Sequence, residues 1–145
     1  MSSKFAFDKK ANAWSALCER ALGEIGRTSN QYFVKSFGKQ SFDGEKWKEV
    51  QRRIPNTPTY KRSSTHLRTS PILINTGKLL QAQYEAVKSI SNNTLVMQND
   101  ATYSGYMNDG TPHVMARPFM QHTMQLQKMQ LQILKAVTGE VWTKA

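Results

Sequence analysis

Residues 84–97, Tyr-Glu-Ala-Val-Lys-Ser-Ile-Ser-Asn-Asn-Thr-Leu-Val-Met, decide the fold class. Residues 84–90 partly alternate between two faces, and Thr94–Met97 is a second run that favours a strand. Ser91-Asn92-Asn93, between the two runs, has the composition of a tight turn. The stretch therefore predicts an antiparallel hairpin, within a small sheet around residues 80–98.

Helical patterns precede the hairpin. Over residues 9–37 apolar side chains recur at helical spacing among good helix formers, which predicts a long N-terminal helix. The step Gly26-Arg27-Thr28-Ser29-Asn30 is expected to kink or break this helix. Asp43 is expected to cap a short second helix that carries Trp47 and Val50.

Further helical patterns follow the hairpin. Residues 101–109 predict a short helix that stops at Gly110, because glycine tolerates a positive φ. Residues 119–138 partly alternate like a strand, but their Met, Gln, Leu and Lys content favours a helix that ends near Gly139. An ordinary core helix is preferred here over a Met-rich interface helix. Residues 1–145 are thus predicted to form a single α+β domain, with a long N-terminal helix, a small antiparallel sheet and a C-terminal helix packed on it.

Composition narrows the class of protein. The 145 residues include 20 Lys and Arg against 10 Asp and Glu, a formal net charge of +10. A positive field of this size suits phosphate backbones, anionic membrane surfaces or acidic proteins. The lone cysteine, Cys18, permits no disulfide within the chain, and no apolar run reaches the ~20 residues that cross a bilayer. These features predict a soluble protein made in a reducing cytosol, without a membrane partner.

Signals of catalysis are absent from the sequence. The chain has neither a phosphate-binding loop followed by Lys-Ser/Thr nor a Gly-x-Ser-x-Gly elbow. Its histidines, His66, His113 and His122, lie far apart without metal-ligand spacing. We therefore expect no enzyme activity, no catalytic residue, no metal and no cofactor.

Residues 51–71 differ from the rest of the chain in charge. They contain three prolines and many hydroxyls, and no Asp or Glu occurs between Glu49 and Glu85. This composition predicts a long basic loop. Three roles stay open for it: binding a nucleic-acid backbone, docking on an acidic protein, or remaining solvated. Its candidate contact residues are Arg52, Arg53, Lys61, Arg62 and Arg68.

Three separated pieces resemble motifs of the phage virion-morphogenesis, or tail-completion, family. They are Phe42 with Trp47, the box Leu73-Ile74-Asn75-Thr76-Gly77-Lys78-Leu79, and Tyr103 and Gly110 followed by Ala116-Arg117-Pro118-Phe119. The likeness covers about residues 40–135, and it departs from the family at Tyr106-Met107, where a polar aromatic residue is usual. The residues expected to define the motif are Trp47, Thr76, Gly77, Leu79, Tyr103, Gly110, Arg117, Pro118 and Phe119.

Most of these motif residues are expected to specify the fold rather than to touch a partner. Gly77 suits a tight turn, and Pro118 suits the first turn of the last helix, where no hydrogen bond is lost. Arg117 offers a fork of donors to a carboxylate or to backbone carbonyls, and Phe119 is expected to anchor the helix to the sheet.

The resemblance implies a structural, non-enzymatic role in a tailed bacteriophage. Such a protein completes the tail or joins it to the head at the neck, as a ring of identical copies for which a hexamer is one candidate. The implied partners are neck or head-closure proteins, tail-terminator or tail-tube proteins and packaged DNA, which an inward-facing basic loop would meet. The implied location is the virion, after synthesis in the host bacterial cytoplasm. The alternative function is non-specific nucleic-acid binding.

Overall fold

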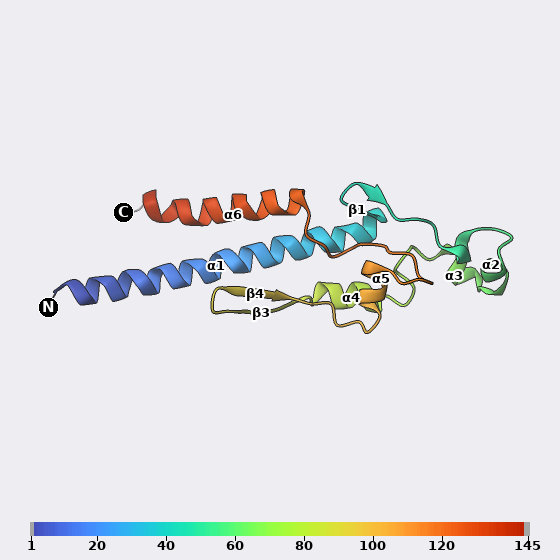
Figure 1. The fold of residues 1–145 in the computed structure, drawn as a ribbon, viewed down its shortest axis with the longest axis horizontal. Coiled ribbons are helices and arrows are strands. Elements are labelled where there is room, and N and C mark those ends of the chain that lie inside the picture. The colour runs from blue at the N-terminus through green and yellow to red at the C-terminus, as the bar shows by residue number, and fades with distance from the viewer. Residues whose placement is uncertain (1, 144–145) are drawn as a thin grey trace.

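The computed structural model describes the backbone of residues 2–143 and the side chains of residues 8–139. The molecule is elongated, with the first and the last of the described residues at one extremity (Figure 1). Along the chain lie α1 (Ser2–Lys39), β1 (Ser41–Phe42), β2 (Glu45–Lys46), the 3-10 helix η1 (Gln51–Arg53), α2 (Pro58–Arg62), α3 (Thr65–Thr69), α4 (Lys78–Tyr84), β3 (Val87–Ser91), β4 (Thr94–Met97), α5 (Ser104–Asp109) and α6 (Met124–Thr143).

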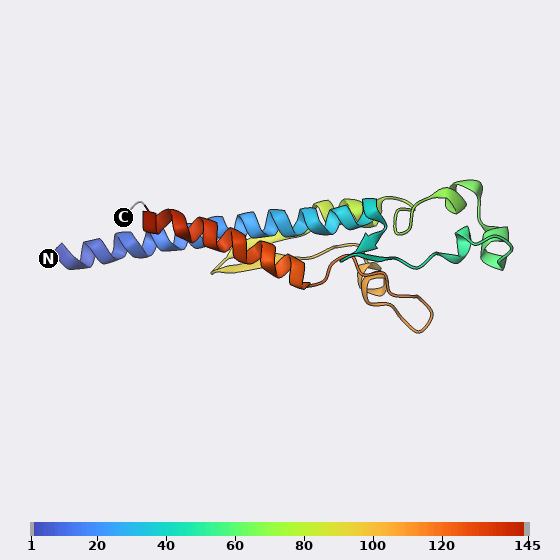
Figure 2. The same ribbon diagram turned by 90° about the horizontal axis from the view of Figure 1, so that it is seen from above.

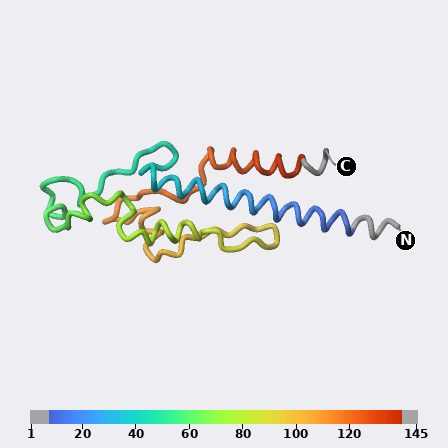
Figure 3. The backbone as a smooth tube through the Cα atoms, turned by 180° about the vertical axis from the view of Figure 1, so that it is seen from behind, coloured from blue at the N-terminus to red at the C-terminus, as the bar shows by residue number. Residues whose placement is uncertain are grey.

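Helix α1 is the axis of the molecule, and it lies between α6 and the hairpin of β3 and β4 (Figures 1 and 3). The α+β class is confirmed, as are the long first helix, the small antiparallel sheet and the C-terminal helix. The main neighbour of α6 differs from the expected one, because α6 packs chiefly along α1. Among the described side chains of α6, Leu126 and Val137 are the buried ones, at a spacing of three helical turns.

The expected break at residues 26–30 is wrong, because α1 is continuous from Ser2 to Lys39. Gly26 is buried where the hairpin crosses the helix. A Cβ atom at this position would lie 3.0 Å from Leu95 Cδ1 and 3.6 Å from Val87 Cγ1. The absence of a side chain at Gly26 therefore lets the hairpin pack closely on α1. This packing outweighs the low helix propensity of glycine, so the helix continues.

The predicted hairpin is confirmed. Strands β3 and β4 pair antiparallel, with Ile90 opposite Leu95 and Ser91 opposite Thr94. Asn92 and Asn93 form the turn with φ values of 48° and 57°, as a two-residue turn with two left-handed positions requires. The hairpin begins later than expected, because residues 78–84 form α4.

A second, smaller hairpin replaces the expected helix at Asp43. Phe42 pairs with Glu45, and Asp43 and Gly44 turn the chain with φ values of 49° and 88°. An Asp-Gly pair suits such a turn, so Asp43 is a turn residue and not a helix cap.

An aromatic core holds the middle of the molecule together. Phe37 packs edge-on against Trp47, with 5.8 Å between ring centroids, and lies 5.2 Å from Phe119. The buried core cluster consists of Phe33, Phe37, Phe42, Trp47, Ile72, Leu79, Phe119 and Leu126. Residues from α1, the small hairpin, α4 and the segment before α6 thus share one core.

A chain of side-chain amides lies beside this core. Gln83 is fully buried, and its amide group donates to Asn30 Oδ1 at 3.0 Å. Asn99 donates to Gln83 Oε1 at 3.0 Å and to the carbonyl of Leu79 at 3.1 Å. These bonds join α1, α4 and the segment after β4, and they give the buried amide groups of Gln83 and Asn99 their partners.

Two other predictions are wrong about boundaries. The expected loop at residues 51–71 contains η1, α2 and α3, which pack mainly against one another at the extremity farthest from the chain ends (Figure 1). Thr57 and Ser64 accept hydrogen bonds from the first turns of α2 and α3 and so begin the two short helices. The helix expected from residue 119 begins at Met124, where Thr123 Oγ1 accepts from the Leu126 amide.

Candidate functional site

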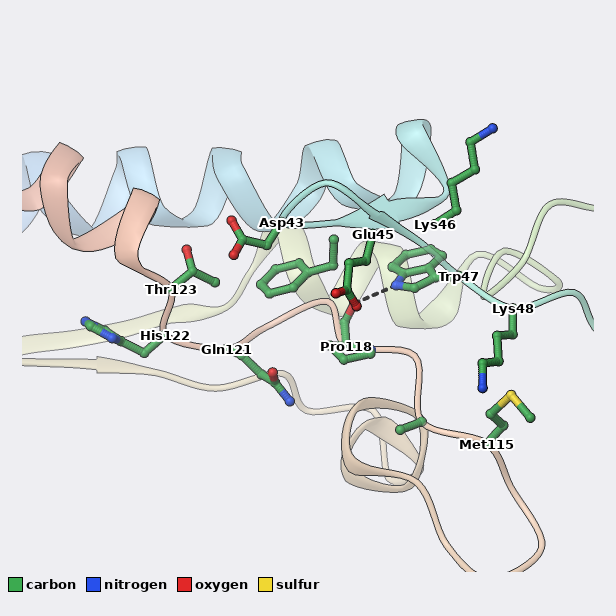
Figure 4. Close-up of a pocket in the computed structure, with 12 residues that line it drawn as sticks. Asp43, Glu45, Lys46, Trp47, Lys48, Met115, Pro118, Gln121, His122 and Thr123 are labelled. Carbon is green, nitrogen blue, oxygen red and sulfur yellow. Dashed lines mark hydrogen bonds between the residues drawn. The ribbon is translucent and has the colours of Figure 1, made fainter.

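The first and third pieces of the motif meet in space, although about 70 residues of chain separate them. Trp47 Nε1 donates to the carbonyl of Pro118 at 2.6 Å (Figure 4). Arg117 Nε donates to the carbonyl of Lys48 at 3.1 Å, and Nη2 donates to that of Glu49 at 3.4 Å. We call this set of contacts the Trp47–Arg117 clamp, because it fastens residues 47–49 to residues 117–118.

Arg117 is buried, with 8% of its surface exposed. Its third contact runs from Nη1 to the carbonyl of Met115 at 3.2 Å. Burial lowers the pKa of the Arg117 guanidinium, and the positive charge of Arg52 lowers it further, while Glu49 opposes both. The predicted fork of donors thus binds backbone carbonyls and not a carboxylate side chain, which makes it a fastener within the fold.

The second piece of the motif approaches the same core from α4. Gly77 precedes the helix with φ 77°, as a tight turn requires, and Leu79 is 1% exposed. Thr76 is exposed on the turn itself. Tyr103 is partly buried against the core cluster, where it precedes α5.

The expected places of Pro118 and Phe119 are wrong. Both residues precede α6 in an irregular segment, so Pro118 does not open a helix. Phe119 is 1% exposed and packs on Phe37 of α1, which makes α1 rather than the sheet its main support. Asn108 was missed by the sequence prediction: its Oδ1 accepts from the amides of both Phe119 and Met120 at 3.0 Å. An asparagine in the last turn of a short helix was the one signal for it.

A groove of about 510 Å³ lies beside the clamp, between the small hairpin and residues 115–123 (Figure 4). Its walls mix Asp43 and Glu45 with Lys46 and Lys48, and His122 stands on the opposite side. Among the described residues, no hydrogen bond or ion pair joins either of these carboxylates to that histidine. The groove therefore offers a mixed polar surface rather than an acid–base pair.

The five contact residues predicted in residues 51–71 differ in their surroundings in the structure. Arg52 donates from Nε to the carbonyl of Leu67 at 2.8 Å and from Nη2 to that of Pro71 at 3.0 Å. Burial lowers the pKa of this guanidinium, and the neighbouring charge of Arg53 adds to the effect. Arg52 thus ties η1 to the end of α3, so its main role is within the fold.

Arg68 also has a structural role. Its Nε donates to the carbonyl of Tyr60 at 2.9 Å, and its guanidinium carbon lies 4.3 Å from the centroid of the Tyr60 ring. Arg53 is half-buried and pairs with Glu49 at 3.5 Å. Lys61 and Arg62 are exposed at the end of α2, so they are the two predicted contact residues with free cationic ends.

Within the described residues, no helix has the length and apolar character needed to cross a bilayer. The same part of the chain gathers no three potential ligands at a place where a metal ion could bind. Comparison of the chain with protein-family models, with curated proteins and with solved structures gives no match.

Proposed function

We propose that this protein is a structural assembly protein of a tailed bacteriophage, which completes the tail or joins it to the head as a ring of identical copies. One observation carries the proposal: the separated motif pieces that resemble the tail-completion family meet around one core. Trp47 bonds to Pro118, and Trp47, Leu79 and Phe119 belong to the same buried cluster. Residues that converge in this way behave as one motif, which supports the resemblance beyond its short sequence pieces.

The shape of the molecule suits contacts with several neighbours. One extremity carries the ends of α1 and α6, and the other carries η1, α2 and α3 (Figure 2). The outer side of α6 exposes large apolar side chains at a spacing of seven and three residues: Met124, Leu131 and Leu134. Exposed apolar side chains in such a row favour a protein neighbour.

Charge predicts when the ring forms. Two copies each carry a formal charge of +10 and repel one another, most strongly at low salt. We expect the isolated chain to be a monomer at low ionic strength and to assemble on a particle that supplies compensating negative charge. Light scattering of the purified chain between low and high salt measures this.

The decisive experiment removes the protein from the phage. Particles made without it are expected to stop as filled heads and separate tails, which electron microscopy distinguishes from complete virions. Supplying the intact chain restores joining, and supplying Trp47→Ala, which breaks the clamp and the core together, does not. A Gly105→Ala chain is the matched control, because an added Cβ there meets no atom within 4 Å. Normal virions without the protein would contradict the assembly role.

A further inference from the structure

Three cations gather at the C-terminal end of α2. Lys61 and Arg62 occupy its last two positions and are exposed. Arg68, from α3, reaches back to them: its Nη2 donates to the carbonyl of Lys61 at 3.3 Å. Arg62 Nε bonds to the carbonyl of Pro58 at 3.3 Å, which leaves its outer nitrogens free. The fold therefore places the Arg68 guanidinium beside the last turn of α2, which carries Lys61 and Arg62.

No carboxylate balances this cluster. Residues 50–84 contain six Lys or Arg and no Asp or Glu, so they supply six of the ten net positive charges. The ion pairs among the described side chains involve Arg27, Arg53 and Lys88, and none of the three cations of the cluster. Carbonyl oxygens accept from the donors but carry no net charge, so no carboxylate among the described residues neutralises the positive charge of this surface.

We infer that residues 51–70, the basic tip, bind the phosphate backbone of a nucleic acid. Lys61 and Arg62 make the phosphate contacts, Arg68 adds charge beside them, and Arg52 holds the tip in shape. Double-stranded DNA presents one negative charge per ~1.7 Å of its axis. The two exposed cations of α2 and the nearby Arg68 can therefore contact phosphates wherever along the duplex the tip binds.

Binding at this tip is independent of base sequence. Tyr60 is the tyrosine of the tip, and the guanidinium of Arg68 lies over one face of its ring, 4.3 Å from the centroid. The face that Arg68 covers is closed to a base, so we expect the contacts to go mainly to phosphates and not to base edges.

A nucleic acid fits the tip better than an acidic protein does. Stable protein interfaces have an apolar centre surrounded by polar groups. Among the described residues of the tip, Ile54 is the one exposed large apolar side chain. An interface here would lack such a centre, whereas phosphate binding needs only the charges.

This inference depends on the charges of the tip and not on the assembly role, so either can fail without the other. The test measures binding of the full chain to a mixed-sequence 20-base-pair DNA duplex by fluorescence anisotropy over a range of salt. Lys61→Gln with Arg62→Gln removes two positive charges from the tip. Lys9→Gln with Lys10→Gln is the matched control, because it removes the same charge from exposed positions near the opposite extremity.

The tip variant is expected to bind about tenfold or more weakly at 0.1 M salt, and its slope of log affinity against log salt falls by about 1.8 for two lost phosphate contacts. The control is expected to change affinity less than about threefold. Lys61→Arg with Arg62→Lys keeps the charge and is expected to bind like the unchanged chain. Unaltered thermal melting of each variant shows that its fold is retained.

Equal losses in the two charge-removing variants would overturn the site, because they would show attraction to the net charge alone. An unchanged affinity of the tip variant would overturn it as well. Poly-L-glutamate provides the remaining test. If the tip variant loses affinity for poly-L-glutamate and not for the duplex, the tip serves an acidic protein, and the inference is wrong.

Discussion

Gly110 shows how one residue sets the path of the motif segment. Its φ is 81°, and a Cβ atom there would lie 2.8 Å from the backbone nitrogen of Ala116. Gly110→Ala therefore combines left-handed strain with a backbone clash, and we expect a loss of about 2 kcal/mol or more in unfolding free energy by urea denaturation. Gly105→Ala, in α5 with open space around it, is expected to be neutral or stabilising by up to about 1 kcal/mol. Equal effects at the two positions would contradict this account.

Arg117 acts through its fork of donors and not through its charge alone. A lysine keeps the charge but cannot reach the carbonyls of Lys48, Met115 and Glu49 together. Buried bonds to a charged donor contribute about 1.5–3 kcal/mol each, so Arg117→Lys is expected to cost about 2 kcal/mol or more in unfolding free energy. Arg53→Lys, in a half-exposed ion pair with Glu49, is the matched change and is expected to cost less than about 1 kcal/mol.

At the scale of helices and strands, the sequence predicted those elements that are specified by neighbouring residues in the chain. Asn92-Asn93 predicted the turn of the hairpin, and apolar residues at helical spacing predicted the helices in the first and last parts of the chain. Asp43 was predicted as a helix cap, but Asp43-Gly44 also has the composition of a hairpin turn, and the structure forms that turn. Thr57 and Ser64 are N-cap residues before short helices. Polar composition concealed them, because five-residue helices show too little apolar periodicity to be recognised.

We predict that one face of helix α6, the face that packs on α1, contributes most of what the helix adds to the stability of the fold. Leu126 is 2% exposed and Leu131 is 47% exposed, so the helix offers the same side chain in two environments. Leu126→Ala should lower the unfolding free energy by about 2–5 kcal/mol, because it leaves a cavity against α1. Leu131→Ala should change it by less than about 1 kcal/mol in the monomer. Urea denaturation compares them, and a large loss at Leu131 alone would show that the faces are assigned wrongly.

At the scale of the whole molecule, the sequence could not predict which residues far apart in the chain come together. The sequence singled out Arg117 and Arg68, but most of their partners are carbonyls of other segments, which no local pattern reveals. The five basic residues of the tip look equivalent in sequence. Only the fold separates these residues. Arg52 and Arg68 bond to carbonyls outside their own helices, whereas Lys61 and Arg62 are exposed and the carbonyl that Arg62 binds belongs to its own helix. Substitutions at Arg52 therefore test the structure of the tip, and substitutions at Lys61 test what it binds.

The basic tip is predicted to open independently of the rest of the molecule. Its helices α2 and α3 pack mainly on η1, and Arg52 and Arg68 join them through carbonyl bonds. Arg52→Ala with Arg68→Ala removes these bonds, so amide hydrogen exchange within residues 54–70 should accelerate about tenfold or more. Exchange in α1 should stay unchanged, because the aromatic core lies outside the tip. Lys61→Gln with Arg62→Gln, which keeps both fasteners, should leave exchange in the tip unaltered. Faster exchange in α1 as well would show that tip and core unfold as one unit, in which case the tip could not act as a separate contact element.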